Sequence, residues 1–371
     1  MLGAMLFEYI LLSIFLPLFL AELAALRLPN IMIKVLIKNG RYEAALKWAG
    51  VYRVVSKILP NWRGYASLTY AGIYMMMGKY DLVQAEAENA VEFYNKRHFA
   101  RYMKVYRAVA KGYLSVALVF NGDKSELEKA ELLSREALDE PLIKGYYRAL
   151  IHCNAITAFL GMAKLEEAQA MIQSLEKTLP AVKNNRRIQY ILLRNKASLL
   201  YLQGNHEGAL EILDHLLPSL IRGKDEYVHT LTLRIRCLSR IKRLEEAEIY
   251  EREIREALEN SSPVLHPSCL LTLSQLALDK KDMDQARHYA EQAADNSHTP
   301  YLLAESMLIQ AEVFAYYKNP NRALALSQQA VELFPVPVYK AWADRIAKTL
   351  KSDVLEQNED ANLLRISNQA G

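Results

Sequence analysis

The side chains that most often carry out catalysis are spaced along this chain in ways that fit no reaction. His152 precedes Cys153, but neighbours on a helix point about 100° apart, so they cannot work together as base and nucleophile. The carboxylate pairs Glu166–Glu167 and Glu245–Glu246 begin predicted helices, where acidic residues complement the helix dipole. The sequence contains no phosphate-binding loop and no His-Glu-x-x-His metal motif. We therefore expect no enzymatic activity, no cofactor and no metal site.

Aromatic side chains suited to binding are more informative. The chain contains 22 tyrosines, and many fall on helices predicted to come first in a helix pair, among them Tyr106, Tyr190 and Tyr201. An exposed tyrosine offers a partner contact area and a hydroxyl at low entropic cost. The alternative is that these rings fill the space between long helices. We take Tyr106, Tyr190 and Tyr201 as candidate partner contacts.

Charge and cysteine content exclude two classes of protein. The formal net charge of the 371 residues is +4, and acidic and basic residues interleave along the predicted helices. A nucleic-acid binder usually shows a concentrated basic stripe, so we expect no nucleic acid as partner. The three cysteines, Cys153, Cys237 and Cys269, are odd in number and lie in apolar runs. This pattern favours buried reduced thiols over a disulfide framework or a metal site.

A small side chain recurs at a nearly fixed period and indicates how the chain is built. The successive spacings are 38, 47, 38, 41, 38, 39 and 37 residues, between Ala45, Val83, Ala130, Ala168, Ala209, Ala247, Ala286 and Ala323. A period of roughly 20–50 residues is typical of a solenoid, in which each unit buries its apolar face against its neighbours. We find no sustained alternation of period two that would predict a sheet. The sequence therefore predicts an all-α solenoid.

Each repeat unit combines the same three local features. A small residue early in a second helix lets the first helix cross it closely, a glycine between them permits a turn with positive φ, and a proline ends the unit. The last unit illustrates this with Pro320, Ala323, Ala330 and Pro335. The spacing of 47 residues predicts either a longer first helix in the third unit, roughly His98–Phe120, or an irregular joint there.

This pattern resembles the tetratricopeptide repeat (TPR), whose signature places Gly-x-Tyr at the turn, Ala three residues later and again after seven more, and then Pro. Gly40-Arg-Tyr42 and Gly78-Lys-Tyr80 carry the motif here, and the resemblance covers about residues 29–335 as eight units. Most spacings exceed the family period by about one helical turn. The resemblance implies a right-handed α-solenoid of about eight TPR-like helix pairs whose first helices line an inner, concave surface. We expect 339–350 to form a C-terminal capping helix and 351–371 to be a disordered tail.

The resemblance also implies an inner basic patch. Matching the units to the family register places three arginines on inner first-helix positions, together with amide and imidazole donors: Arg194, Asn195, His229, Arg236, Arg240 and Gln275. Such a patch would suit a carboxylate or an acidic peptide. The alternative is a solvated face that has no part in binding.

The amino-terminal residues 1–28 are mostly apolar, and 9–21 carry no charge. A membrane-spanning helix needs about 20 such residues, so we expect a membrane anchor there, followed by the solenoid over 29–350. A signal peptide, a monotopic helix and a buried first helix are the alternatives. Arg27, Lys34, Lys38 and Arg41 follow the segment, which places the repeats on the cytoplasmic side.

These features together predict a membrane-tethered scaffold or assembly factor that presents its TPR solenoid to a protein partner. We expect that partner to be membrane-associated or to carry an acidic segment, and we expect no small-molecule substrate. The alternative function is a peptide-binding regulatory TPR receptor.

Overall fold

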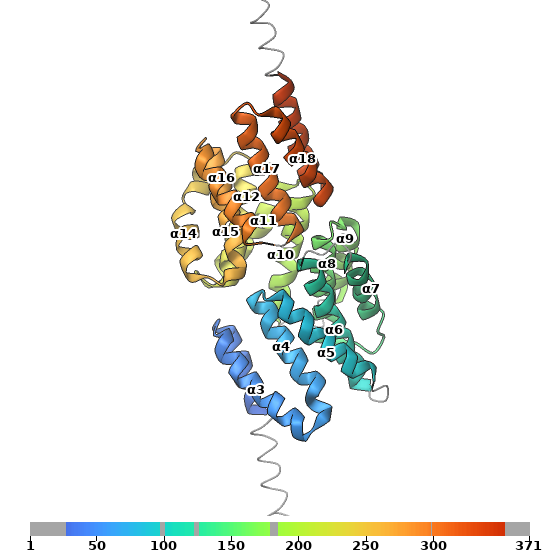
Figure 1. Cartoon of the computed structure of the whole chain (residues 1–371). Coiled ribbons are helices and arrows are strands. Elements are labelled where there is room, and N and C mark those ends of the chain that lie inside the picture. The colour runs from blue at the N-terminus through green and yellow to red at the C-terminus, as the bar shows by residue number, and fades with distance from the viewer. Residues whose placement is uncertain (1–26, 97–100, 122–125, 179–184, 298, 353–371) are drawn as a thin grey trace, which may run out of the picture.

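The computed structural model describes residues 27–96, 101–121, 126–178, 185–297 and 299–352. Every regular element in these ranges is a helix, and the helices form eight consecutive pairs (Figure 1). The pairs are α2 (Leu28–Lys38) and α3 (Tyr42–Ile58), α4 (Arg63–Met77) and α5 (Tyr80–Asn95), α6 (Arg101–Phe120) and α7 (Leu127–Leu138), α8 (Gly145–Gly161) and α9 (Leu165–Thr178), α10 (Arg186–Leu202) and α11 (His206–Leu216), α12 (Asp225–Arg240) and α13 (Leu244–Glu248) with α14 (Glu251–Asn260), α15 (His266–Asp279) and α16 (Met283–Asp295), and α17 (Pro300–Tyr316) and α18 (Pro320–Leu333).

The recurring small residues lie where the two helices of each pair cross. All eight are completely buried, including Val83, the one residue that is not alanine. The residue seven positions later is buried as well in every pair, since two helical turns return it to the same face: Tyr52, Ala90, Ala137, Leu175, Leu216, Ile254, Ala293 and Ala330. These two positions form the seam along which each second helix packs.

Two elements depart from a uniform repeat. Helix α6 (Arg101–Phe120) has 20 residues, which accounts for the long spacing into the third unit; 97–100 lie outside the described residues. In the sixth unit the second helix is divided into α13 and α14. The Tyr250 amide bonds the carbonyl of Ala247, three residues back, so the helix tightens there. Neither the break nor its position was predicted.

A final helix covers the last pair. Residues 337–352 are helical, and Tyr339, Trp342, Ile346 and Leu350 are buried in the main core. The Trp342 ring nitrogen donates to Glu312 of α17 at 2.5 Å. Because an uncapped solenoid would leave an apolar edge in water, this helix has the role expected of a terminal cap.

The predicted membrane location is corrected by the structure. In the ranges given above, no helix combines the length and the apolar character needed to cross a bilayer. The predicted anchor, residues 1–28, lies outside the described residues except for Arg27 and Leu28. The predicted tail, 351–371, is likewise described only at 351–352, so the division into anchor, solenoid and tail stays a prediction.

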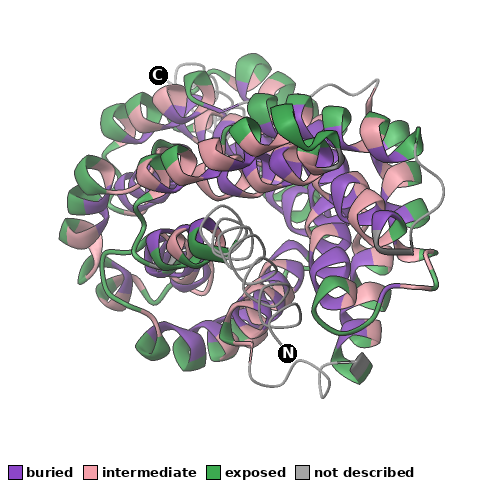
Figure 2. Ribbon diagram, turned by 90° about the horizontal axis from the view of Figure 1, so that it is seen from below, coloured by how far each residue is buried: buried purple, intermediate pink, exposed green. Residues whose placement is uncertain are grey.

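The helix pairs curve into a nearly closed ring. Seen along its axis, exposed residues mark the outer rim, and buried ones lie between successive helices (Figure 2). This curvature brings the turns that follow α2 and α4 close to the turns that precede α12 and α15. In Figure 1 the first helices lie below α14 and α15. A side chain added to Gly78, which ends α4, would overlap Val264 just before α15, so the second unit is in contact with the start of the seventh.

We expect the seam to tolerate no larger side chain. Ala209→Leu or Ala323→Leu would force two helices apart and lower the free energy of unfolding by about 1–3 kcal/mol. Gln328→Leu, on the exposed face of α18, is the control and should change it by less than about 0.5 kcal/mol. Thermal denaturation of the three variants measures the difference, and equal shifts would mean that the seam is misplaced.

Candidate functional site

The fifth and sixth units turn a polar stripe toward the ring axis. On α10, Arg187, Tyr190, Arg194 and Tyr201 recur at spacings of three, four and seven residues, so they share one helical face. Asn185 caps the amino-terminal end of this helix, because its side chain accepts a hydrogen bond from the Ile188 amide at 3.1 Å. On α12, His229 and Arg236 are seven residues apart and share a face in the same way.

These side chains line a cavity of about 290 Å³ on the axis, which we call the axial pocket. All eight units contribute to it, from Tyr42 of α3 to Tyr301 of α17. Its wall is mainly aromatic and aliphatic, with a few polar groups among them, which is the usual composition of a ligand site. The aromatic and apolar part includes Tyr80, Tyr113, Phe120, Tyr190, Tyr201, Leu233 and Tyr301.

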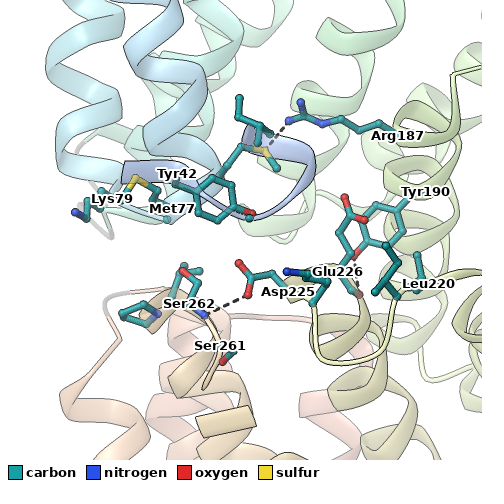
Figure 3. A pocket seen from close by; sticks show the side chains of 18 of the residues that line it. Tyr42, Met77, Lys79, Arg187, Tyr190, Leu220, Asp225, Glu226, Ser261 and Ser262 are labelled. Atoms are coloured by element: carbon teal, nitrogen blue, oxygen red, sulfur yellow. Dashed lines mark hydrogen bonds between the residues drawn. The ribbon is translucent and has the colours of Figure 1, made fainter. Parts of the chain in front are cut away.

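A larger cleft of about 2200 Å³ adjoins the axial pocket and shares Tyr42, Arg187 and Tyr190 with it. Turns of the first two units form one side of the cleft, and turns of the fifth to seventh units form the other (Figure 3). Basic side chains outnumber acidic ones in its lining. The basic residues are Lys34, Arg41, Lys47, Lys79, Arg186, Arg187 and Lys224, and the acidic residues are Glu43, Asp81, Asp225 and Glu226.

Few interactions hold the two sides of the cleft together. The Lys224 ammonium donates to the Asn39 carbonyl at 3.3 Å, and Arg187 donates to the sulfur of Met76 at 2.6 Å. Tyr42 points across the cleft to Asp225 (Figure 3). Burial, followed by the charge of Asp225, raises the pKa of Tyr42 to about 12. With the Gly78–Val264 contact, these pairs form the ring closure.

Arg194 lines the axial pocket and forms no close ion pair in the described residues; the opposite charge of Glu226 acts on it only at longer range. In the described part of the chain, no carboxylate lies within 4.0 Å of its guanidinium, which donates instead to the Asn195 side chain at 2.7 Å. Burial raises the pKa of Tyr190 to about 12, and the positive charge of Arg194 opposes that rise. The pKa of His229 is lowered to about 3 by burial and then by the charge of Arg194, so the imidazole is neutral near pH 7.

Arg236 has a different environment, although it lines the same pocket. It donates to the fully buried carboxylate of Glu305 at 2.6 Å. Tyr201 and Tyr339 donate to this carboxylate at 2.9 and 3.2 Å, and the Arg240 guanidinium lies 3.8 Å from it. We call this set the Glu305 cluster. It joins α10, α12 and α17 to the capping helix.

The predicted contact residues thus fall into two sets. The axial pocket brings together Arg194, Asn195, His229, Arg236, Tyr190 and Tyr201. The other three lie away from it: Arg240 stacks on Trp342 at 3.4 Å, Gln275 is buried in α15, and Tyr106 packs against Tyr65 and Tyr147. Whether any of the nine binds a partner stays a prediction.

Sequence reasoning missed the part of the site that comes from the far side of the ring. Tyr42, Met76, Tyr80, Val264 and Tyr301 line the axial pocket, yet no spacing connects them to Arg194. These residues lie close to Arg194 only because the curvature of successive units adds up around the ring. The Gly-x-Tyr turns that contain Tyr42 and Tyr80 were the only available signal, and we interpreted them as turn chemistry.

The cysteines are buried and free, as the sequence indicated. Burial raises the pKa of Cys153, Cys237 and Cys269 to about 12, which leaves little thiolate at neutral pH. Within the described ranges, no group of three or more His, Cys, Asp or Glu residues could hold a metal ion.

No protein-family model matches the chain. A curated relative, the HTH-type transcriptional regulator MalT of Vibrio parahaemolyticus, is 27% identical over 233 residues, which are 62% of this chain but 25% of that protein. The chain therefore spans about a quarter of the length of the relative it matches.

Among solved structures, a Rap protein complexed with competence and sporulation factor aligns with a TM-score of 0.54 at 12% identity, covering 78% of this chain and 80% of that one. The TPR domain of P58(IPK) covers 88% of this chain and 98% of its own at 12% identity, with a TM-score of 0.25 that supports no finer comparison. The fold is TPR-like. At these identities the likeness concerns the fold alone.

The ring closure can be tested at Gly78. Gly78 and Gly204 both have positive φ, 66° and 84°, but a Cβ at Gly204 meets nothing within 4 Å, whereas one at Gly78 overlaps Val264. Gly204→Ala should cost about 1–2 kcal/mol from backbone strain alone. Gly78→Ala should cost more and should also increase the radius of gyration in small-angle X-ray scattering, because the ring must open. Indistinguishable melting and scattering of the two variants would refute the closure.

The Glu305 cluster can be tested at Arg236. Arg236→Ala leaves the buried Glu305 carboxylate short of its main partner and should lower the free energy of unfolding by about 3–5 kcal/mol. Arg252→Ala removes an exposed pair with Glu256 and should cost less than about 0.5 kcal/mol. Chemical denaturation of both variants measures this contrast, and a small loss at Arg236 would mean that the pair is not structural.

Proposed function

We propose that this protein is a protein–protein interaction scaffold that receives a segment of its partner in the cleft. A helical solenoid offers a long continuous surface and few positions that can be organised for catalysis, which makes binding of macromolecules its usual role. The cleft of about 2200 Å³ is the observation that carries the proposal, since it is large enough for an extended or helical polypeptide segment.

The chemistry of the lining favours an acidic segment in the partner. The basic excess comes from several units, and some of these cations have no acidic partner of their own. Lys47 and Arg186 are exposed and, in the described part of the chain, belong to no ion pair. A positive cleft attracts a negative segment at long range and sets its orientation on docking.

The alternative of a peptide-binding regulatory receptor is not favoured. The Rap structure is a complex with a regulatory factor by its name, and MalT is a transcriptional regulator, but identities of 12% and 27% do not extend those roles to this chain. The membrane tether is not retained in the proposal. The expectation that the protein is not an enzyme stays a prediction, compatible with the scaffold role.

Reversing charge in the cleft tests the proposal. The double variant Lys47→Glu/Arg186→Glu should weaken capture of the partner from a cell extract at least about tenfold, through loss of electrostatic complementarity. The double variant Lys177→Glu/Lys348→Glu makes the same change in net charge at exposed residues outside the cleft and should capture the partner like the parent protein. Mass-spectrometric quantification of the captured proteins gives the comparison. Equal capture by the two double variants would exclude the cleft as the binding surface.

A further inference from the structure

Several polar atoms around the axial pocket are buried without a hydrogen-bond partner in the described part of the chain. They include the Nε atoms of Arg194 and Arg236 and the side-chain amide nitrogen of Asn154. All three are hydrogen-bond donors whatever their protonation state. A buried donor without a partner costs roughly 1–3 kcal/mol, so a group of them in one cavity needs an explanation.

The charges around these donors have the same sign. Arg187 and Arg194 both reach the pocket without an ion pair in the described residues, and Arg236 shares its carboxylate with Arg240. Asp225 and Glu226 also line the pocket, but neither forms an ion pair with Arg187 or Arg194 in the described residues. Asp225 accepts a hydrogen bond from the Ser262 amide at 3.2 Å, and Glu226 interacts with the two arginines only at longer range. The interior of the pocket therefore needs acceptors that carry negative charge.

The remaining wall residues indicate the chemistry of the rest of the ligand. Tyrosine and phenylalanine rings and the side chains of Leu233 and Ile191 form much of this wall, with neutral hydroxyl groups such as Ser198 and Ser268 among them. A volume of about 290 Å³ is at the lower end of the range for small-molecule sites. The matching ligand is small, largely apolar and negatively charged at one end.

We propose that the axial pocket binds a carboxylate group carried on an apolar body, with Arg194 as its principal partner. The planar guanidinium presents two parallel N–H donors to the two oxygens of a carboxylate, which a single ammonium cannot do. Asn154 supplies a further donor, and the neutral His229 beside Arg194 adds a polar group without competing charge.

Such a ligand closes the ring. The pocket wall consists of Tyr42 and Tyr80 from the first two units on one side, and of Arg194 and Tyr301 from the fifth and eighth units on the other. A group that contacts both sides binds the closed ring better than an open one. Its binding and the Gly78–Val264 contact therefore stabilise each other.

The carboxylate has two possible sources, a free small acid or the segment of the protein partner. If the partner supplies the carboxylate, the inference rests on the proposed function, because the partner segment then reaches the pocket through the cleft. If the ligand is a free acid, it does not. The test of the pocket uses no partner, so its failure would leave the cleft proposal standing. The capture experiment can fail in turn without affecting the pocket.

The probe is benzoate, with benzamide as its neutral counterpart of the same shape. Titration calorimetry of the full chain should show saturable benzoate binding with a dissociation constant of about 1 mM, and at least about tenfold weaker binding of benzamide. In NMR spectra the His229 ring signal should shift with benzoate, and His229→Gln assigns that signal. Equal affinity for the two probes, or no binding of either, would overturn the proposal.

Arg194→Met, which keeps the length of the side chain, should abolish benzoate binding. It should melt at about the same temperature as the parent protein or higher, because it removes a partly buried charge that has no close ion pair. Arg107→Met on α6, partly buried and outside the pocket, is the matched control and should keep full affinity. Arg194→Lys should restore only part of the affinity. Unchanged binding by Arg194→Met would overturn the assignment.

Two further measurements identify the source and test the link to ring closure. If Arg194→Met also loses partner capture, the partner supplies the carboxylate; if capture is normal, the ligand is a free acid. Gly78→Ala, which does not line the axial pocket, should bind benzoate at least about threefold more weakly, and benzoate should reduce its radius of gyration. Parent-like benzoate affinity in Gly78→Ala would show that the ligand does not hold the ring closed.

Discussion

The close crossing of two helices over a small side chain is the constraint on which the rest of this structure depends. At every crossing the first of the two seam residues is completely buried, and in seven of the eight pairs it is alanine. An alanine allows the helix axes to approach, and that approach sets the angle at which one pair meets the next. Because the same angle recurs, the chain bends steadily in one direction until its first units reach its later ones. The ring, the cleft and the axial pocket are consequences of this repeated local geometry.

Two arginines in the axial pocket have different roles: Arg236 stabilises the fold, and Arg194 is the proposed binding group. Arg236 and Arg194 face the same cavity from adjacent units, but the buried carboxylate of Glu305 neutralises only Arg236. The Glu305 cluster ties three units to the capping helix, so its charges have a structural role. The charge of Arg194 has no such partner and adds to burial in lowering the pKa of the neighbouring His229. A protein keeps a partly buried cation without an ion pair at a cost in stability, and that cost is understandable if the cation is needed for a ligand.

The parts of the molecule that depend on local packing could be predicted from the sequence. The positions of Ala209 and Ala323, the long third-unit helix that ends at Phe120 and the capping helix around Trp342 follow from helical periodicity and from the size of one side chain. The inner placement of Arg194 and His229 came from the family register, which carries over because each unit repeats its neighbour. The pairing of Arg236 with Glu305 was not foreseen, because Glu305 lies in a mainly apolar helix two units away and no pattern marks it.

The sequence could not predict that the second unit would reach the start of the seventh. A change of a few degrees at each crossing, summed over several units, decides whether Gly78 reaches Val264 or passes it at a distance. Side-chain types do not encode such small angles one by one, and most repeat spacings here are longer than those of the family. The few contacts across the cleft are therefore the part of the structure that is most easily changed, by mutation or by a ligand. A site that includes those contacts, as the axial pocket does with Tyr42 and Arg194, is placed where a small binding energy can alter the shape of the whole molecule.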